Sequence, residues 1–200
     1  YNLVELTSGS TRVLLDPALG GVVVRYESNY DGQHIPWFQP RGLGCPGTFP
    51  LLPFASRIRN GAFQYLGKSV RLAANNPPEV HAIHGHGWQR VWSVHRQTET
   101  SVVLEFVYEG GDWPWSYMAR QTVQLQEMVL EISLQITNCS QEPMPIGFGL
   151  HPYFPLTQEC RVDLQVSHEW LLDDELMSDR RVSCADRFAN GVKPALVRMD

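Results

Sequence analysis

Strict alternation of apolar and polar side chains over residues 130–137 limits what this chain can fold into more than any other feature of its sequence. The apolar positions are Leu130, Ile132, Leu134 and Ile136. Because successive side chains of a strand point to opposite faces, a period of two predicts a strand with one face buried. Residues 122–126 alternate in the same way, and the short break at residues 126–128 predicts an antiparallel hairpin between the two runs.

Further strands and many turns are predicted along the rest of the chain. The other strand candidates are residues 12–15, 22–26, 102–108 and 162–166. Segments rich in Gly and Pro, which stop strands and prevent long helices, lie at residues 39–44, 75–78 and 142–145. Many short strands predict an all-β antiparallel sandwich or barrel. With 200 residues and no shift in composition, a single domain over residues 1–200 is expected.

Charge and cysteine usage exclude several classes of function. The net charge is −5 and no run of Lys and Arg is present, so a nucleic-acid partner is not expected. The cysteines are irregularly spaced without a Cys-x-x-Cys pair, which disfavours a zinc site and a disulfide scaffold; they are Cys45, Cys139, Cys160 and Cys184. Neither a signal-like start nor a bilayer-long apolar run is present, so we expect a cytoplasmic protein that does not enter a membrane.

Three histidines crowd residues 81–88: His81, His84 and His86. A His-x-His pair in a β-rich protein suggests a metal, because cupin-type barrels present two imidazoles on one strand face. The glutamate ligand that follows in that pattern is absent from residues 89–92, so the metal hypothesis is disfavoured. The alternative, that these histidines only hydrogen-bond a loop, stays open for each of them taken singly.

A second candidate is His151, which lies in residues 147–155 (GFGLHPYFP) directly before a proline. A residue before proline is biased toward extended geometry, which would project the imidazole from the end of a strand. Histidine suits acid or base chemistry at neutral pH because its usual pKa is about 6.5. Taken alone, a packed loop histidine beside aromatic residues is an equally good interpretation.

Two arginines and several tryptophans add possible ligand-binding groups. Arg57 and Arg59 flank an isoleucine and would point to one side of an extended chain, where they could bind sugar hydroxyls, carboxylates or phosphates. A solvated arginine with an ion-paired one is the competing interpretation, and it is stronger for Arg59. Residues 110–115 (GGDWPW), with Trp88 and Trp92, offer aromatic faces for a sugar ring or for the core.

In order and spacing, these motifs resemble the aldose 1-epimerase (galactose mutarotase) family. Residues 49–58 resemble the family's Asn-Arg-Ile segment, with Ser56 in the place of the asparagine and Arg57 in the place of the sugar-contacting arginine. Residues 83–85 resemble its Leu-His-Gly segment, and residues 149–154 resemble its His-Pro-Tyr-Phe segment. The resemblance covers essentially the whole chain and implies a large antiparallel β-supersandwich.

The resemblance also implies an activity and its residues. Members interconvert the α and β anomers of a free aldose without cofactor or metal. His151 would be the acid at the ring oxygen, His84 a supporting donor, and the base a glutamate near the family's C-terminus, beyond Asp200, so the C-terminal part of the fold is expected to be missing from the chain. The expected substrate-binding residues are Arg57, His86, Trp88, Asp112 and Tyr153.

Two alternatives stay open. A hexose-6-phosphate 1-epimerase could use the same acid and base, with Arg57, Arg59 and Arg90 holding the phosphate. A non-catalytic carbohydrate-binding module could share the fold. The expected partner is a small aldose whose identity the sequence does not specify, and the expected assembly is a monomer or homodimer.

Overall fold

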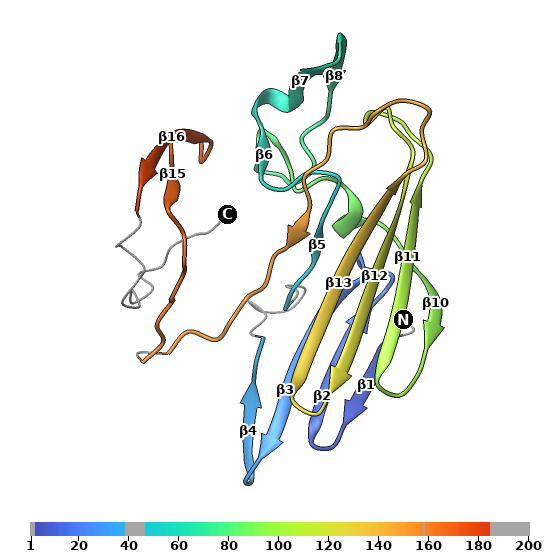
Figure 1. The fold of residues 1–200 in the computed structure, drawn as a ribbon, viewed down its shortest axis with the longest axis vertical. Coiled ribbons are helices and arrows are strands. Elements are labelled where there is room, and N and C mark those ends of the chain that lie inside the picture. The colour runs from blue at the N-terminus through green and yellow to red at the C-terminus, as the bar shows by residue number, and fades with distance from the viewer. Residues whose placement is uncertain (1–2, 39–46, 158, 185–200) are drawn as a thin grey trace. The chain divides into compact units, whose positions relative to one another are not determined.

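A computed structural model describes residues 3–38, 47–157 and 159–184 (Figure 1). Strands dominate these residues, and their helical content is limited to two short 3-10 turns, η1 (Arg59–Gly61) and η2 (Gly87–Gln89). The prediction of an all-β chain without long helices is therefore confirmed.

Two four-stranded antiparallel sheets supply the core (Figure 1). The first consists of β1 (Val4–Ser8), β2 (Thr11–Asp16), β3 (Val22–Tyr30) and β4 (Gln33–Pro36). The second consists of β10 (Ser93–Gln97), β11 (Ser101–Tyr108), β12 (Tyr117–Gln126) and β13 (Val129–Asn138). Buried side chains of both sheets, such as Leu6 and Leu15 from the first and Leu104 and Val123 from the second, belong to one apolar cluster. The sheets thus pack face to face, as in a β-sandwich.

The predicted hairpin is β12 followed by β13, which pair from Tyr117↔Asn138 to Gln126↔Val129. Every second side chain of β12 is buried, as the alternation requires. One of these side chains, Gln121, is polar. Its buried amide Nε2 donates a hydrogen bond to the carbonyl of Gly21 at 2.7 Å. This bond joins the second sheet to the start of β3 in the first.

The predicted strands at residues 12–15, 22–26 and 102–108 correspond to β2, β3 and β11. The strand expected at residues 162–166 was wrong, because the last hairpin pairs β15 (His168–Leu172) with β16 (Ser178–Ser183). Asp173 accepts hydrogen bonds at Oδ1 from the amides of Glu175 and Met177, both at 2.9 Å. This turn determines which residues pair, and alternation alone carries no information about the partner strand.

Short strand pairs connect the large sheets. They are β5 (Pro50–Leu51) with β14 (Gly149–Leu150), β6 (Arg57–Ile58) with β9 (Ala82–Ile83), and β7 (Ala62–Tyr65) with β8 (Lys68–Arg71). By its internal contacts the chain divides into two compact units, Tyr1–Pro155 and Leu156–Asp200. That residues 1–200 form a single domain stays a prediction. Within the described ranges, no helix is long and apolar enough to cross a membrane.

Candidate active site

The backbone of residues 47–58 brings the two histidine motifs together. On one side, β5 pairs with β14, and the amide of His151 donates to the carbonyl of Phe49 at 3.0 Å. On the other side, Leu52 forms a parallel bridge with Gly85, and its carbonyl accepts the amide of His86 at 3.0 Å. Segments that lie more than 60 residues apart in the sequence are therefore held on either side of one extended segment.

The imidazoles of His84 and His151 meet at this point. Their ring centroids are 5.3 Å apart and the ring planes are inclined at 83°, so one edge faces the other ring. His151 stacks on Phe49 at 4.9 Å and 15°, and on Tyr153 at 4.8 Å and 27°. Trp88 packs on Phe49 with centroids 5.5 Å apart. Aromatic side chains thus pack around the two imidazoles.

Two hydrogen bonds with the backbone of Ser56 hold His84, one through its amide and one through its side chain. The amide of His84 donates to the Ser56 carbonyl at 2.9 Å, and the amide of Ser56 donates to Nδ1 of His84 at 3.1 Å. Because Nδ1 accepts this hydrogen bond, the neutral imidazole carries its proton on Nε2. The side chain is buried, so this Nε2–H is a donor in a fixed orientation.

The turn after His84 requires glycine at position 85. Gly85 has φ +65°, and a Cβ built on it would lie 2.0 Å from the Leu52 carbonyl oxygen. His84 itself has φ +59°, a left-handed conformation that costs a non-glycine residue about 1 kcal/mol. The close approach of this turn to Leu52 is what places His84 beside His151.

Arg57 comes next to Ser56 and pairs across β6 and β9 with Ile83, the residue before His84. Its side chain is 4% exposed and forms an ion pair with Glu79. Nε donates to Oε2 at 2.7 Å and Nη2 donates to Oε1 at 3.3 Å. The Arg57 guanidinium holds the pKa of Glu79 below its usual value. Nη1 of Arg57 is buried and has no hydrogen-bond partner among the residues that the structure describes.

That Arg57 and Arg59 point to one side stays a prediction. Ile58 between them is extended, and the 3-10 turn η1 starts at Arg59, followed by Asn60 with φ +52°. The two arginines differ in exposure: Arg59 is exposed, whereas the Arg57 side chain is buried.

His86 and Asp112 lie in a second polar cluster with two tyrosines. Nε2 of His86 is 2.7 Å from the Tyr117 hydroxyl, and its ring packs on Tyr108 at 4.1 Å. The Tyr108 hydroxyl donates to Oδ1 of Asp112 at 3.1 Å. Burial lowers the pKa of His86 to about 4, so its ring is neutral at physiological pH. His86 and Asp112 are thus linked through Tyr108, and that they contact the substrate stays a prediction.

The tryptophans divide between core and site. Trp92, Trp113 and Trp115 are buried in the main apolar cluster. Trp88 is half-buried and packs on Phe49, so among these four tryptophans it is the one at the histidine pair.

Sequence reasoning missed two residues of this site, Phe49 and Glu79. The apolar run around Phe49 predicts burial but not a stack with a histidine. Glu79 follows Pro78 in a connector 22 residues after Arg57, and nothing in that spacing indicates an ion pair. No three His, Cys, Asp or Glu side chains cluster as metal ligands within residues 3–38, 47–157 and 159–184.

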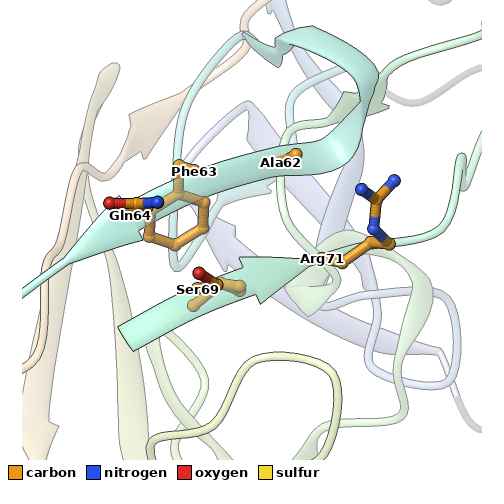
Figure 2. Close-up of a pocket in the computed structure, with 6 residues that line it drawn as sticks. Ala62, Phe63, Gln64, Ser69 and Arg71 are labelled. Carbon is orange, nitrogen blue, oxygen red and sulfur yellow. The ribbon is translucent and has the colours of Figure 1, made fainter. Parts of the chain in front are cut away.

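A cavity of about 340 Å³ lies elsewhere, on the β7–β8 hairpin (Figure 2). Its lining residues are Ala62, Phe63, Gln64, Ser69, Val70 and Arg71. None of the predicted site residues lines it, so it is distinct from the histidine pair.

Comparison with known proteins gives a consistent result. A family model for aldose 1-epimerase matches residues 2–188. The uncharacterized protein YphB of Escherichia coli (strain K12) is 36% identical over 123 residues, which are 62% of this chain and 42% of that protein.

Solved structures share the fold. A provisionally named aldose 1-epimerase from Escherichia coli K12 aligns with a TM-score of 0.83 and 26% identity, over 95% of this chain and 65% of that one. A galactose mutarotase-like protein from Clostridium acetobutylicum aligns with a TM-score of 0.81 and 20% identity, over 96% and 65%. The predicted mutarotase-like β-supersandwich is confirmed. The chain spans less than two thirds of the length of these relatives.

Proposed function

Because the chain belongs to the aldose 1-epimerase family, we propose that it carries the sugar site of a mutarotase that interconverts the α and β anomers of a free aldose. Family membership supports a carbohydrate-epimerase role in general. The specific reaction rests on the His84 and His151 pair, whose rings lie 5.3 Å apart in edge-to-face contact.

The reaction needs an acid and a base on opposite sides of the hemiacetal. A base removes the proton of the C1 hydroxyl while an acid protonates the ring oxygen, which breaks the bond between C1 and that oxygen. After rotation about C1–C2, the oxygen attacks the other face of the aldehyde and both protons return. Two imidazoles in contact disfavour a double positive charge, so at most one of them serves as the acid at a time.

The hydrogen bonds of His84 indicate which of the two histidines is the acid. Protonation of Nδ1 in His84 would break its bond with the Ser56 amide, so His84 stays neutral and donates from Nε2. His151 is then the imidazole that protonates the ring oxygen. The other group that the reaction requires is a base, which the resemblance to the family assigns to a glutamate. Tyr153 and Trp88, which both pack against the buried Phe49, provide aromatic faces suited to the C–H groups of a pyranose.

A free aldose fits this site better than a sugar phosphate. Glu79 already occupies the Nε and Nη2 edge of Arg57 and offsets its charge. Arg59 and Arg90 are exposed. Among these three arginines, a phosphate would therefore meet no buried cation whose charge is uncompensated.

The test is exchange between sugar anomers, followed by NMR with glucose and galactose, in the natural protein that carries residues 1–200. We expect exchange faster than the uncatalysed rate. Binding of the sugar without acceleration would favour a carbohydrate-binding module, and acceleration confined to 6-phosphates would favour the phosphate-specific enzyme. A cytoplasmic location and a monomeric or dimeric state stay predictions from the sequence.

A further inference from the structure

We propose that Glu79 is a positioning residue that makes this site selective for neutral aldoses: it binds the Nε–Nη2 edge of Arg57, offsets its charge, and leaves Nη1 as a donor nitrogen for a sugar hydroxyl. This inference rests on the proposed function and deepens it. Neither the family motifs nor the histidine pair requires an acidic residue at this position.

The contacts of Arg57 carry the first step. A guanidinium has two edges, Nε–Nη2 and Nη1–Nη2, each of which matches a carboxylate or phosphate. In Arg57 the Nε–Nη2 edge binds the two oxygens of Glu79 at 2.7 and 3.3 Å, and this carboxylate offsets the charge of the guanidinium. The bond fixes the plane of the guanidinium, and so fixes the direction of Nη1.

Nη1 of Arg57 is a buried donor without a protein acceptor among the described residues. Nη1 belongs to a side chain that is only 4% exposed, and it finds no acceptor within the described part of the chain. A buried donor without a partner is unfavourable, so its retention points to an acceptor that arrives with the ligand. The N–H groups of Nη1 suit a neutral oxygen acceptor such as a sugar hydroxyl.

The negative charge of Glu79 disfavours a phosphorylated sugar. Glu79 is 25% exposed and its pKa is lowered chiefly by the hydrogen bond with Arg57, so it is ionised when the protein works. Its partner Arg57 pairs with Ile83, the residue before His84, so the ion pair lies on the strand pair that leads into the histidine site. An incoming phosphate would face this negative charge in a poorly solvated place, whereas a neutral hydroxyl would not.

The experiment compares Glu79→Gln with wild type and with Glu131→Gln, a matched change on the exposed face of β13. Glutamine can still accept a hydrogen bond from Arg57 but leaves its charge uncompensated. Ligand-observed NMR would give dissociation constants for glucose and galactose and for their 6-phosphates. Anomeric exchange would give KM and kcat for the free sugars.

We expect wild type to bind the free sugar at least about tenfold more tightly than its 6-phosphate, and Glu79→Gln to shrink this ratio by about tenfold, the effect of one hydrogen bond to a charged group. KM for the free sugar should rise by a similar factor while kcat changes less than about threefold. A general loss of structure would instead lower kcat and melting temperature together.

Two outcomes overturn the inference. One is a folded Glu79→Gln variant with an unchanged ratio of dissociation constants. The other, which needs no variant, is a wild-type preference for the 6-phosphate. Failure of the proposed function looks different, because wild type would then neither bind the free sugars nor accelerate their exchange.

Discussion

Nδ1 of His84 accepts the backbone N–H of Ser56 at 3.1 Å, while the backbone N–H of His84 donates to the Ser56 carbonyl at 2.9 Å. Both bonds use backbone atoms of Ser56. The family's asparagine can therefore be replaced by serine here without losing either bond. Ser56 has φ +61°, a left-handed conformation that asparagine adopts more readily than most residues, which explains why asparagine suits this position in relatives.

This pair of bonds predicts that structure and catalysis can be separated at His84. In His84→Asn, the amide oxygen can accept from Ser56 and the left-handed backbone is tolerated, so the melting temperature should stay close to wild type. In His84→Ala, both the bond and the backbone preference are lost, and stability should fall by about 1–3 kcal/mol. Both variants lack the Nε2–H donor, so kcat should fall by about 100-fold in each.

Thermal melts and anomeric-exchange NMR on the two variants check this prediction. An active His84→Asn variant would show that the donor is dispensable. An unfolded one would show that asparagine does not replace the imidazole in the loop.

The two histidine clusters predict unequal effects on the reaction. His151→Ala removes the proposed acid and should lower kcat/KM by about 10² or more. His86→Ala removes a ring that packs on Tyr108 and bonds Tyr117, so it should chiefly lower stability. Rates should be compared below the melting temperature of both variants. A larger rate loss in His86→Ala would reverse the assignment of the acid.

Much of the fold could be predicted because alternation is a local signal. The β12–β13 hairpin follows from side chains between Thr122 and Thr137 alone. The strand expected at residues 162–166 was wrong because strand pairing depends on a partner, and the turn at Asp173 selects residues 168–183 instead. The local alternation shows that a segment can form a strand, but it does not show with which other strand that segment pairs.

The candidate site could also be predicted from the sequence only in part. His84, His151 and Arg57 stand in recognisable motifs, so the sequence could indicate them. Glu79 and Phe49 could not be indicated, because their contacts with Arg57 and His151 exist only after distant segments pair. The burial of His86 next to Tyr117, 31 residues away, is likewise a product of packing between segments.

A glycine substitution tests how the His84 turn is held. Gly85→Ala would place a Cβ 2.0 Å from the Leu52 carbonyl oxygen and force the backbone apart. Gly67→Ala is the matched control, since Gly67 also has positive φ, +80°, but has open space around it. We expect the control to lose about 1 kcal/mol from left-handed strain and Gly85→Ala to lose at least about 2 kcal/mol more. Equal losses in urea denaturation would mean that the turn relaxes freely.

Acid should destabilise the protein through His86. Burial lowers the pKa of this residue from 6.5 to about 4, against Asp112, which raises it, and with Arg90, which lowers it further. Between these values the unfolded chain takes up a proton that the folded chain refuses, so the free energy of unfolding falls as pH drops from about 6.5 to about 4. Above about 6.5 this contribution is complete and constant.

The size of the effect follows from the same shift. A difference of this size between the pKa values of the folded and unfolded states changes the free energy of unfolding by at most about 3 kcal/mol. His86→Gln supplies the control, because glutamine can bond the Tyr117 hydroxyl but does not titrate. Urea denaturation at pH 7.5, 5.5 and 4.5 should show wild type losing more stability than the variant as pH falls. The hydroxyls of Tyr108 and Tyr117 cannot produce this difference, since burial raises the pKa of each and both stay protonated throughout. Parallel losses in the two proteins would therefore mean that His86 is solvated and titrates normally in the folded state.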